Sequence, residues 1–188
     1  GGSTEIMWVK NINNEEFVIL GMLSLPIGVV TLSEQYADDT IKVDQFEEII
    51  ANVDQKLAPF DQKYGISDYL FSNKVQMLGT SGTVTTLGGI YLNLPRYDRS
   101  KVDGLDMRVE AITAISESLV KMNHAELAKK FCVGKERAGL VVMGCAILEA
   151  ICRRWPTTTI RIADRGIREG LLKGLMRDNY EISKKSII

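Results

Sequence analysis

A long apolar segment in the last third of the chain limits what this sequence can fold into. Residues 135–154 have the spacing of one long helix, and the middle of that helix is apolar on nearly every side. Such a helix must be covered all round. Its most apolar part, residues 138–152, is too short to span a bilayer and contains Glu149. We therefore expect a buried central helix with other elements packed around it.

Shorter patterns on both sides of this helix predict the rest of the fold. Alternating or β-branched runs predict strands, and apolar residues at helical spacing predict helices. The expected strands are residues 5–9, 17–25, 74–78 and 158–163, and the expected helices are residues 29–36, 44–59, 83–91, 109–122, 125–130 and 165–176. Residues 94–106 read as a charged loop. This order predicts one α/β domain over residues 1–188, with a mixed sheet and helices on both faces.

Two helix ends carry specific signals. Asp44 with Glu47 three residues later resembles a capping box, and Pro59 is expected to end the same helix. Asp164 is expected to cap the last helix. Capping and a functional role for the charged turn after Asp164 both stay open.

Charge and composition exclude several classes of function. The net charge is −1 at pH 7, so there is no basic field that would favour nucleic acid or an anionic membrane as a partner. Any bound anion needs a local site. No signal peptide is visible, and we expect a cytoplasmic protein. The three cysteines match no zinc or redox spacing, and Cys145 and Cys152 are expected to be buried. The lone histidine, His124, has no neighbouring metal ligands in sequence.

One candidate anion site is a glycine-rich turn between a strand and a helix. Its residues are Gly79, Thr80, Ser81, Gly82 and Thr83. Glycine lets the backbone approach an anion, and the following helix start offers unpaired N–H groups and a partial positive charge. No Gly-Lys-Ser/Thr follows, so the turn is not a Walker A loop. A tight turn without a ligand is an equal alternative on this pattern alone.

A second candidate is the beginning of the chain. Gly1, Gly2, Ser3 and Thr4 precede a strand, and Glu5 follows. In a hairpin such a turn can wrap a phosphoryl group, with Glu5 as a magnesium ligand or water-orienting carboxylate. On this pattern alone, a cloning scar followed by a glutamate at the start of a strand is the better explanation.

Basic residues elsewhere are further candidates for phosphate contacts. Arg96, Arg99 and Lys101 lie in the charged loop, and Arg168 lies in the turn that opens the last helix. Arginine binds phosphate with two parallel hydrogen bonds. A solvated surface loop is the alternative.

Read together, these segments resemble the exopolyphosphatase/guanosine-pentaphosphate phosphohydrolase (Ppx/GppA) family. Gly1-Gly2-Ser3-Thr4-Glu5 is similar to the end of that family's first hairpin motif in its second domain. Ser24-Leu25-Pro26-Ile27-Gly28-Val29-Val30, the turn from Gly79 to Leu87, and Asp164-Arg165-Gly166-Ile167-Arg168-Glu169-Gly170 follow in the family's order and spacing. The resemblance runs from Gly1 to about Met176 and favours native glycines over a scar.

The resemblance implies a fold and a reaction. The fold would be the ribonuclease-H-like type of the actin, sugar kinase and Hsp70 superfamily. The reaction would be hydrolysis of a terminal phosphate of inorganic polyphosphate or guanosine pentaphosphate, with Mg²⁺ as the cofactor. Gly1, Gly2, Ser3 and Thr4 would bind the cleaved phosphoryl group and Glu5 would be the catalytic, metal-organising carboxylate. The turn from Gly79 to Thr83 would face the cleft from the other side and hold more distal phosphates or the nucleotide.

The resemblance also implies what is missing. The motif's opening aspartate, the first strand of its sheet and the first domain with the general base have no counterpart in this chain. We therefore expect no hydrolysis by this polypeptide alone. From the open sheet edge and exposed apolar surface that this implies, we expect a homodimer, strand exchange or a proteolytic fragment. A phosphotransferase of the same superfamily and a non-catalytic polyphosphate- or nucleotide-binding module are the alternatives.

Overall fold

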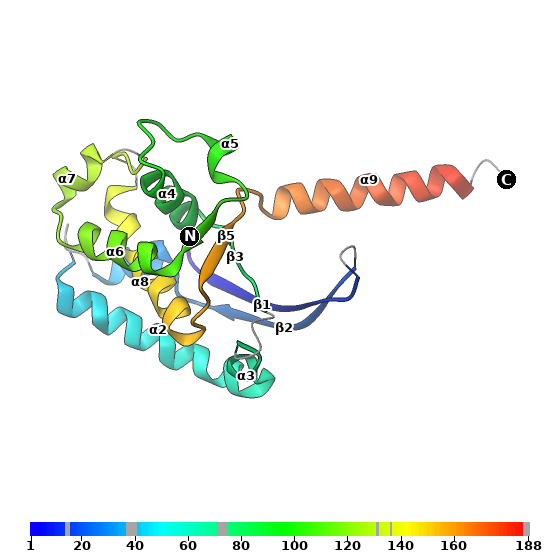
Figure 1. The fold of residues 1–188 in the computed structure, drawn as a ribbon, viewed down its shortest axis with the longest axis horizontal. Helices are drawn as coiled ribbons and strands as arrows, with labels where there is room; N and C mark the ends of the chain where they lie inside the picture. The colour runs from blue at the N-terminus through cyan, green and yellow to red at the C-terminus, as the bar shows by residue number, and fades with distance from the viewer. Residues whose placement is uncertain (14–15, 37–40, 71–74, 131, 136, 186–188) are drawn as a thin grey trace.

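The computed structural model describes residues 1–13, 16–36, 41–70, 75–130, 132–135 and 137–185, and side chains as far as Met176. Its elements follow one another along the chain (Figure 1) as β1 (Thr4–Asn11), β2 (Phe17–Leu25), α1 (Val29–Gln35), α2 (Val43–Tyr64), α3 (Ile66–Leu70), β3 (Met77–Gly79), α4 (Gly82–Tyr91), α5 (Arg99–Val102), β4 (Asp106–Arg108), α6 (Val109–Val120), α7 (His124–Lys129), α8 (Ala138–Arg154), β5 (Thr159–Ile162) and α9 (Ile167–Lys185).

Helix α8 is the centre of the packing, as its apolar sequence predicted. It contacts α1, α2, α4, α6 and α7. Cys145, Ala146 and Ala150 have no exposed surface, and Cys152 is also buried. Burial of Cys145 and Cys152 is thus confirmed. Small side chains in the middle of the helix let its neighbours approach from several sides.

The strands form a mixed sheet and a separate hairpin. Strand β5 lies between β3 and β4; it pairs with β3 in parallel and with β4 in antiparallel register. Strands β1 and β2 pair with each other in antiparallel register, with an irregularity between Trp8 and Val9. The predicted hairpin and the predicted α/β fold with a mixed sheet are confirmed. Strand β4 lies at the end of the segment expected to be a loop. Its three residues are too few to show a period.

Helix α2 corrects two predictions. Lys42, rather than Asp44, is its N-cap residue, and the Lys42 backbone N–H donates to the side chain of Gln45 at 2.9 Å. Pro59 lies inside the helix instead of ending it. An internal proline costs about 3 kcal/mol, but Leu57 and Phe60 on either side of it are buried and hold the helix in place. The helix ends where Gly65 adopts a left-handed conformation (φ 59°).

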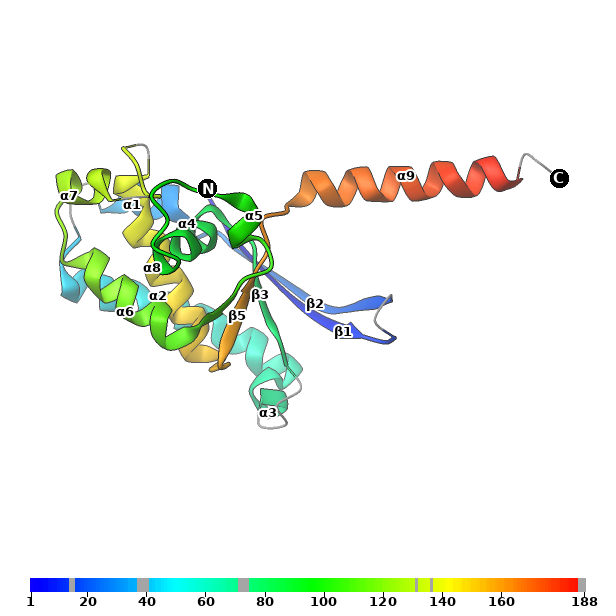
Figure 2. The same ribbon diagram turned by 45° about the horizontal axis from the view of Figure 1, so that its top comes forward.

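Helix α9 begins at Ile167, so Asp164 precedes it by three residues and is not its N-cap. It continues to Lys185, beyond the expected end at residue 176. In both ribbon views it projects away from the other helices (Figures 1 and 2). Among the described helices, none combines the length and apolar composition that crossing a bilayer requires.

Candidate functional site

The beginning of the chain is clamped against the start of α1. The Gly1 carbonyl accepts a hydrogen bond from Val30 N at 3.0 Å. Thr4 Oγ1 donates to the Ile27 carbonyl at 2.7 Å. A Cβ on Gly28 would lie 2.1 Å from the Gly1 carbonyl oxygen and 2.6 Å from Ser3 N, so only glycine fits there. Two segments predicted separately, residues 1–5 and residues 24–30, therefore form one unit.

Glu5 is held in this unit by hydroxyl groups. Its Oε1 accepts hydrogen bonds from Ser3 Oγ at 2.6 Å and from Ser24 Oγ at 3.3 Å. The residue itself is exposed. Glu5 is thus a fixed, water-accessible carboxylate beside a glycine-rich turn. Within the described residues, no three His, Cys, Asp or Glu side chains are grouped as a metal site made by protein ligands alone would require.

The turn between β3 and α4 is built as predicted, but its hydroxyl groups have structural contacts. Ser81 is the N-cap of α4 and accepts the Val84 N–H at 3.2 Å. Thr80 Oγ1 donates to the Arg165 carbonyl at 2.7 Å. Thr83 lies against α8, where a Cβ on Gly144 would be 2.0 Å from Thr83 Oγ1. The donors that suit an anion here are therefore the backbone N–H groups of the first helical turn.

Arg137 lies beside this helix start and was missed in the sequence. Its Nη1 donates to Thr86 Oγ1 at 3.0 Å. Its Cζ lies 3.9 Å from the position a Cβ on Gly82 would take. The guanidinium is thus placed at the same helix end as the Gly79–Thr83 turn. In the sequence, Arg137 is only a basic residue just before a buried helix. It reaches the turn because α4 packs on α8.

The other predicted arginines are arranged differently. Arg99 pairs with Asp164 at 3.4 Å and with Glu169 at 3.7 Å, and it donates to the Asp164 carbonyl. Arg96 and Arg168 are exposed. Arg99 therefore connects residues 96–99 to the start of α9. Its hydrogen bonds and ion pairs to Asp164 and Glu169 do not involve either glycine turn.

Tyr97 is part of the same connection. Its hydroxyl donates to Asp164 Oδ2 at 2.5 Å. Burial, together with the neighbouring Asp164 carboxylate, raises the pKa of Tyr97 to about 12. Asp103 accepts the Asp164 N–H at 2.9 Å and Arg165 Nε at 3.1 Å. These hydrogen bonds, that of the Asp164 N–H first, hold the pKa of Asp103 below its usual value.

The two glycine turns are both supported by helix α8. Helix α1, which begins at the first turn, and helix α4, which begins at the second, both pack on α8. In both ribbon views the N-terminus lies beside α4 (Figures 1 and 2). The arrangement offers backbone donors from residues 1–4 and from the start of α4, a fixed carboxylate and one guanidinium, which suits an extended phosphate chain.

A sequence model of the Ppx/GppA phosphatase family matches residues 1–179. The chain belongs to this family. The resemblance seen in the order of the motifs is thereby confirmed. Comparison with curated protein sequences finds no significant match.

Solved structures of Ppx/GppA proteins share the fold. The Aquifex aeolicus family member is 24% identical with a TM-score of 0.74, over 95% of this chain and 55% of that one. An exopolyphosphatase-like protein is 21% identical with a TM-score of 0.77, over 95% of this chain and 57% of that one. An exopolyphosphatase from Cytophaga hutchinsonii is 20% identical with a TM-score of 0.75, over 95% of this chain and 55% of that one. These structures share the predicted α/β fold with its mixed sheet, and the chain spans little more than half of each of them.

Proposed function

We propose that this chain is the phosphate-binding half of a hydrolase that removes the terminal phosphate of inorganic polyphosphate or guanosine pentaphosphate. The observation that carries the proposal is the clamped turn at residues 1–5 in a Ppx/GppA chain. Its Gly1 carbonyl and Thr4 hydroxyl are both hydrogen-bonded to residues 27–30, which sets the turn before any ligand binds. Donors fixed in advance stabilise developing charge without reorganising during the reaction.

Each part of the site has a distinct role in this proposal. Residues 1–4 bind the terminal phosphoryl group that is transferred to water, through backbone N–H groups. The first turn of α4 and Arg137 bind phosphates further along the chain. A guanidinium can form two parallel hydrogen bonds to one phosphate, so Arg137 adds orientation as well as charge. A water then attacks the terminal phosphorus, and the remaining polyphosphate leaves.

Magnesium fits the donors around Glu5. Mg²⁺ is commonly bound by one or two carboxylates together with substrate phosphates, and Glu5 is a fixed and exposed carboxylate in the site. When bound, the ion would neutralise phosphate charge and polarise the bond to be broken. Ser3 and Ser24 orient Glu5 for that contact.

The proposal includes a second domain. If Glu5 held the magnesium ion, a different carboxylate would be needed to activate water, and we assign it to a further domain facing this one. The chain alone is then expected to bind polyphosphate without hydrolysing it. The solved relatives, of which this chain spans 53–57%, support a longer parent protein.

The deciding experiment measures Mg²⁺-dependent phosphate release from polyphosphate and guanosine pentaphosphate. It compares this chain, the longer parent protein and the parent with Glu5→Gln. Glu34→Gln, an exposed carboxylate on α1, is the matched control. Release by the parent, lost in Glu5→Gln and kept in the control, is expected. Release by this chain at the parent's rate overturns the need for a second domain, and binding without release by the parent overturns the hydrolase.

A further inference from the structure

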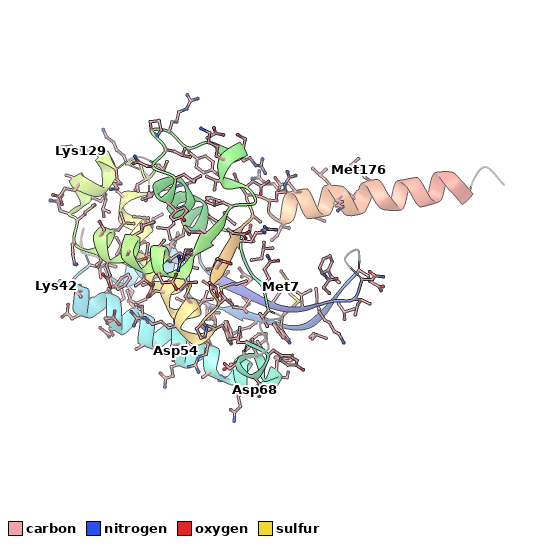
Figure 3. The ribbon with its side chains drawn as sticks, in the orientation of Figure 1. Met7, Lys42, Asp54, Asp68, Lys129 and Met176 are labelled. Carbon is pink, nitrogen blue, oxygen red and sulfur yellow. The ribbon has the colours of Figure 1, made fainter. Side chains whose placement is uncertain are left out.

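A cavity of about 290 Å³ lies where the helices α2, α6 and α8 meet. Both α2 and α6 pack on α8, and side chains from all three helices form its walls. The α2 residues that line it, within 43–47, lie between Lys42 and Asp54, which are both labelled in Figure 3. The residues that line the cavity include none from either glycine turn. The cavity is therefore separate from the site proposed for phosphate.

Glu149, on α8, is a buried carboxylate that lines this cavity with only 4% of its surface exposed. Its two oxygens share one donor, Thr113 Oγ1, at 3.1 and 3.2 Å, and Arg153 Nε lies 3.4 Å from Oε1. An ionised carboxylate accepts about four hydrogen bonds, and a buried one needs both a paired charge and those bonds. These long contacts therefore leave Glu149 short of donors on the side of the cavity.

The charge of Glu149 is also only partly balanced. Arg153 Nη1 and Nη2 donate to Glu47 at 2.6 and 2.9 Å, so Glu47 and Glu149 share one guanidinium. At the rim, Glu117 and Lys121 are exposed and add one charge of each sign. The residues that line the cavity thus include three carboxylates and two cations. One negative charge remains, which favours a ligand with one positive charge.

Ser116, on α6, brings an unused hydroxyl group to the same cavity. The residue is 1% exposed, and its Oγ has no hydrogen-bond partner among the residues that the structure describes. The Cys145 thiol lies near it, but a thiol is only a weak hydrogen-bonding group. A buried polar group without a partner is costly, so a ligand that donates to Ser116 is favoured. Phe46 and Val120, both buried, give the cavity an apolar wall.

We propose that this cavity binds a small primary alkylammonium ligand, with the ammonium group between Glu149 and Ser116 and the alkyl chain against Phe46 and Val120. An ammonium group carries three N–H donors and one positive charge, which are the two things that the buried oxygens lack. A water molecule takes about 30 Å³ in the liquid, so a cavity of about 290 Å³ has room for several heavy atoms.

Titration calorimetry with n-butylammonium chloride tests the site, in this chain and in the longer parent protein. We expect one ligand per chain and, for five heavy atoms, a dissociation constant on the order of 1 mM. Butyrate has the opposite charge and tetramethylammonium has no N–H donor, and both should bind at least tenfold more weakly. Absence of butylammonium binding, or equal binding of either control compound, overturns the proposal. Binding to this chain but not to the parent also overturns it, because the parent then fills the cavity itself.

Three variants assign the binding to these residues. Glu149→Gln removes the buried charge at nearly constant size, and we expect affinity to fall at least tenfold. Ser116→Ala should weaken binding about fivefold without lowering the melting temperature, because the hydroxyl has no partner to lose. Glu48→Gln, an exposed carboxylate on α2 outside the cavity, is the matched control and should bind as the unmodified chain does.

Circular dichroism checks the fold of each variant. Ser116→Ala decides the question by itself if Glu149→Gln does not fold. Unchanged butylammonium affinity in a folded Glu149→Gln or Ser116→Ala variant overturns the proposal. An equal loss in Glu48→Gln does so as well, because it indicates a general effect of negative charge on the surface.

Discussion

The backbone of Gly28 touches that of Gly1: a Cβ at position 28 would lie 2.1 Å from the Gly1 carbonyl oxygen. This contact joins the first turn of the chain to the start of α1. The geometry of the proposed phosphate site thus depends on a glycine that is not expected to contact phosphate.

Gly28→Ala tests this dependence. The added methyl group must push residues 1–3 away from α1, and we expect polyphosphate binding to weaken at least tenfold, because the backbone donors are displaced. Titration calorimetry measures the affinity. Gly139→Ala is the control, since a Cβ there has nothing within 4 Å. Unchanged affinity in Gly28→Ala would mean that the turn does not bind the ligand.

Gly144→Ala tests the support of the second turn. A Cβ there would be 2.0 Å from Thr83 Oγ1, and the helices α4 and α8 must separate to admit it. Overpacking of this kind costs typically 1–3 kcal/mol. Urea denaturation gives the free energy of unfolding, and Gly139→Ala on the same helix is expected to be neutral or slightly stabilising. Equal values for both variants would contradict the close approach of α4 and α8.

Arg137→Gln tests the residue that the sequence did not single out. Loss of a charged donor beside the start of α4 is expected to lower polyphosphate affinity by roughly 10- to 150-fold, which corresponds to the about 1.5–3 kcal/mol typical of hydrogen bonds to charged groups. The slope of affinity against salt concentration should also fall. Arg108→Gln, an exposed arginine paired with Glu110, is the control. An equal loss in both variants would indicate a non-specific charge effect.

The raised pKa of Tyr97 predicts a loss of stability at high pH. Folding raises the pKa of Tyr97 from 10.0 to about 12, so its neutral form is favoured in the folded state. The resulting stabilisation is complete below pH 10 and is lost as the pH rises to about 12. Urea denaturation across this range should show a steeper loss of stability in the unmodified chain than in Tyr97→Phe. Parallel curves would contradict the Tyr97–Asp164 hydrogen bond.

The lowered pKa of Asp61 predicts a loss of stability as the pH falls in acid. Burial raises its pKa, but hydrogen bonds from Trp155 and Ser67 outweigh burial and leave the pKa below the ordinary 3.8. Its stabilisation is present above pH 3.8 and is lost as the pH falls through the lower folded value. At neutral pH Asp61→Asn should cost about 1–3 kcal/mol. The variant should also lose less stability on acidification than Asp68→Asn, the exposed control.

Local patterns predicted the elements that are long or strongly periodic. The central helix and the hairpin were recognised because their apolar spacing repeats over several residues, and the turn at Gly79 was recognised by its glycines. Strand β4, with three residues, carries no such repeat. The predicted end of α2 at Pro59 was wrong, because burial of Leu57 and Phe60 on either side of the proline keeps the helix intact.

The candidate site was recognised in part. Residues 1–5 and the Gly79–Thr83 turn were predicted from glycines, hydroxyls and motif order. Packing decided that Thr80 bonds to Arg165, that Arg99 pairs with Asp164, and that Arg137 stands beside α4. The partners in the first two contacts are 85 and 65 residues apart in the chain.

The sequence by itself determined the buried central helix and the order of strands and helices, because each depends on residues close together in the chain, and it indicated the family through the order and spacing of its motifs. Only the tertiary structure decided which hydroxyls remain for a ligand, which arginine faces the turn and where apolar surface stays exposed. The physical reason is that a local pattern encodes which face of an element is buried, whereas contacts between distant segments depend on how those faces pack together.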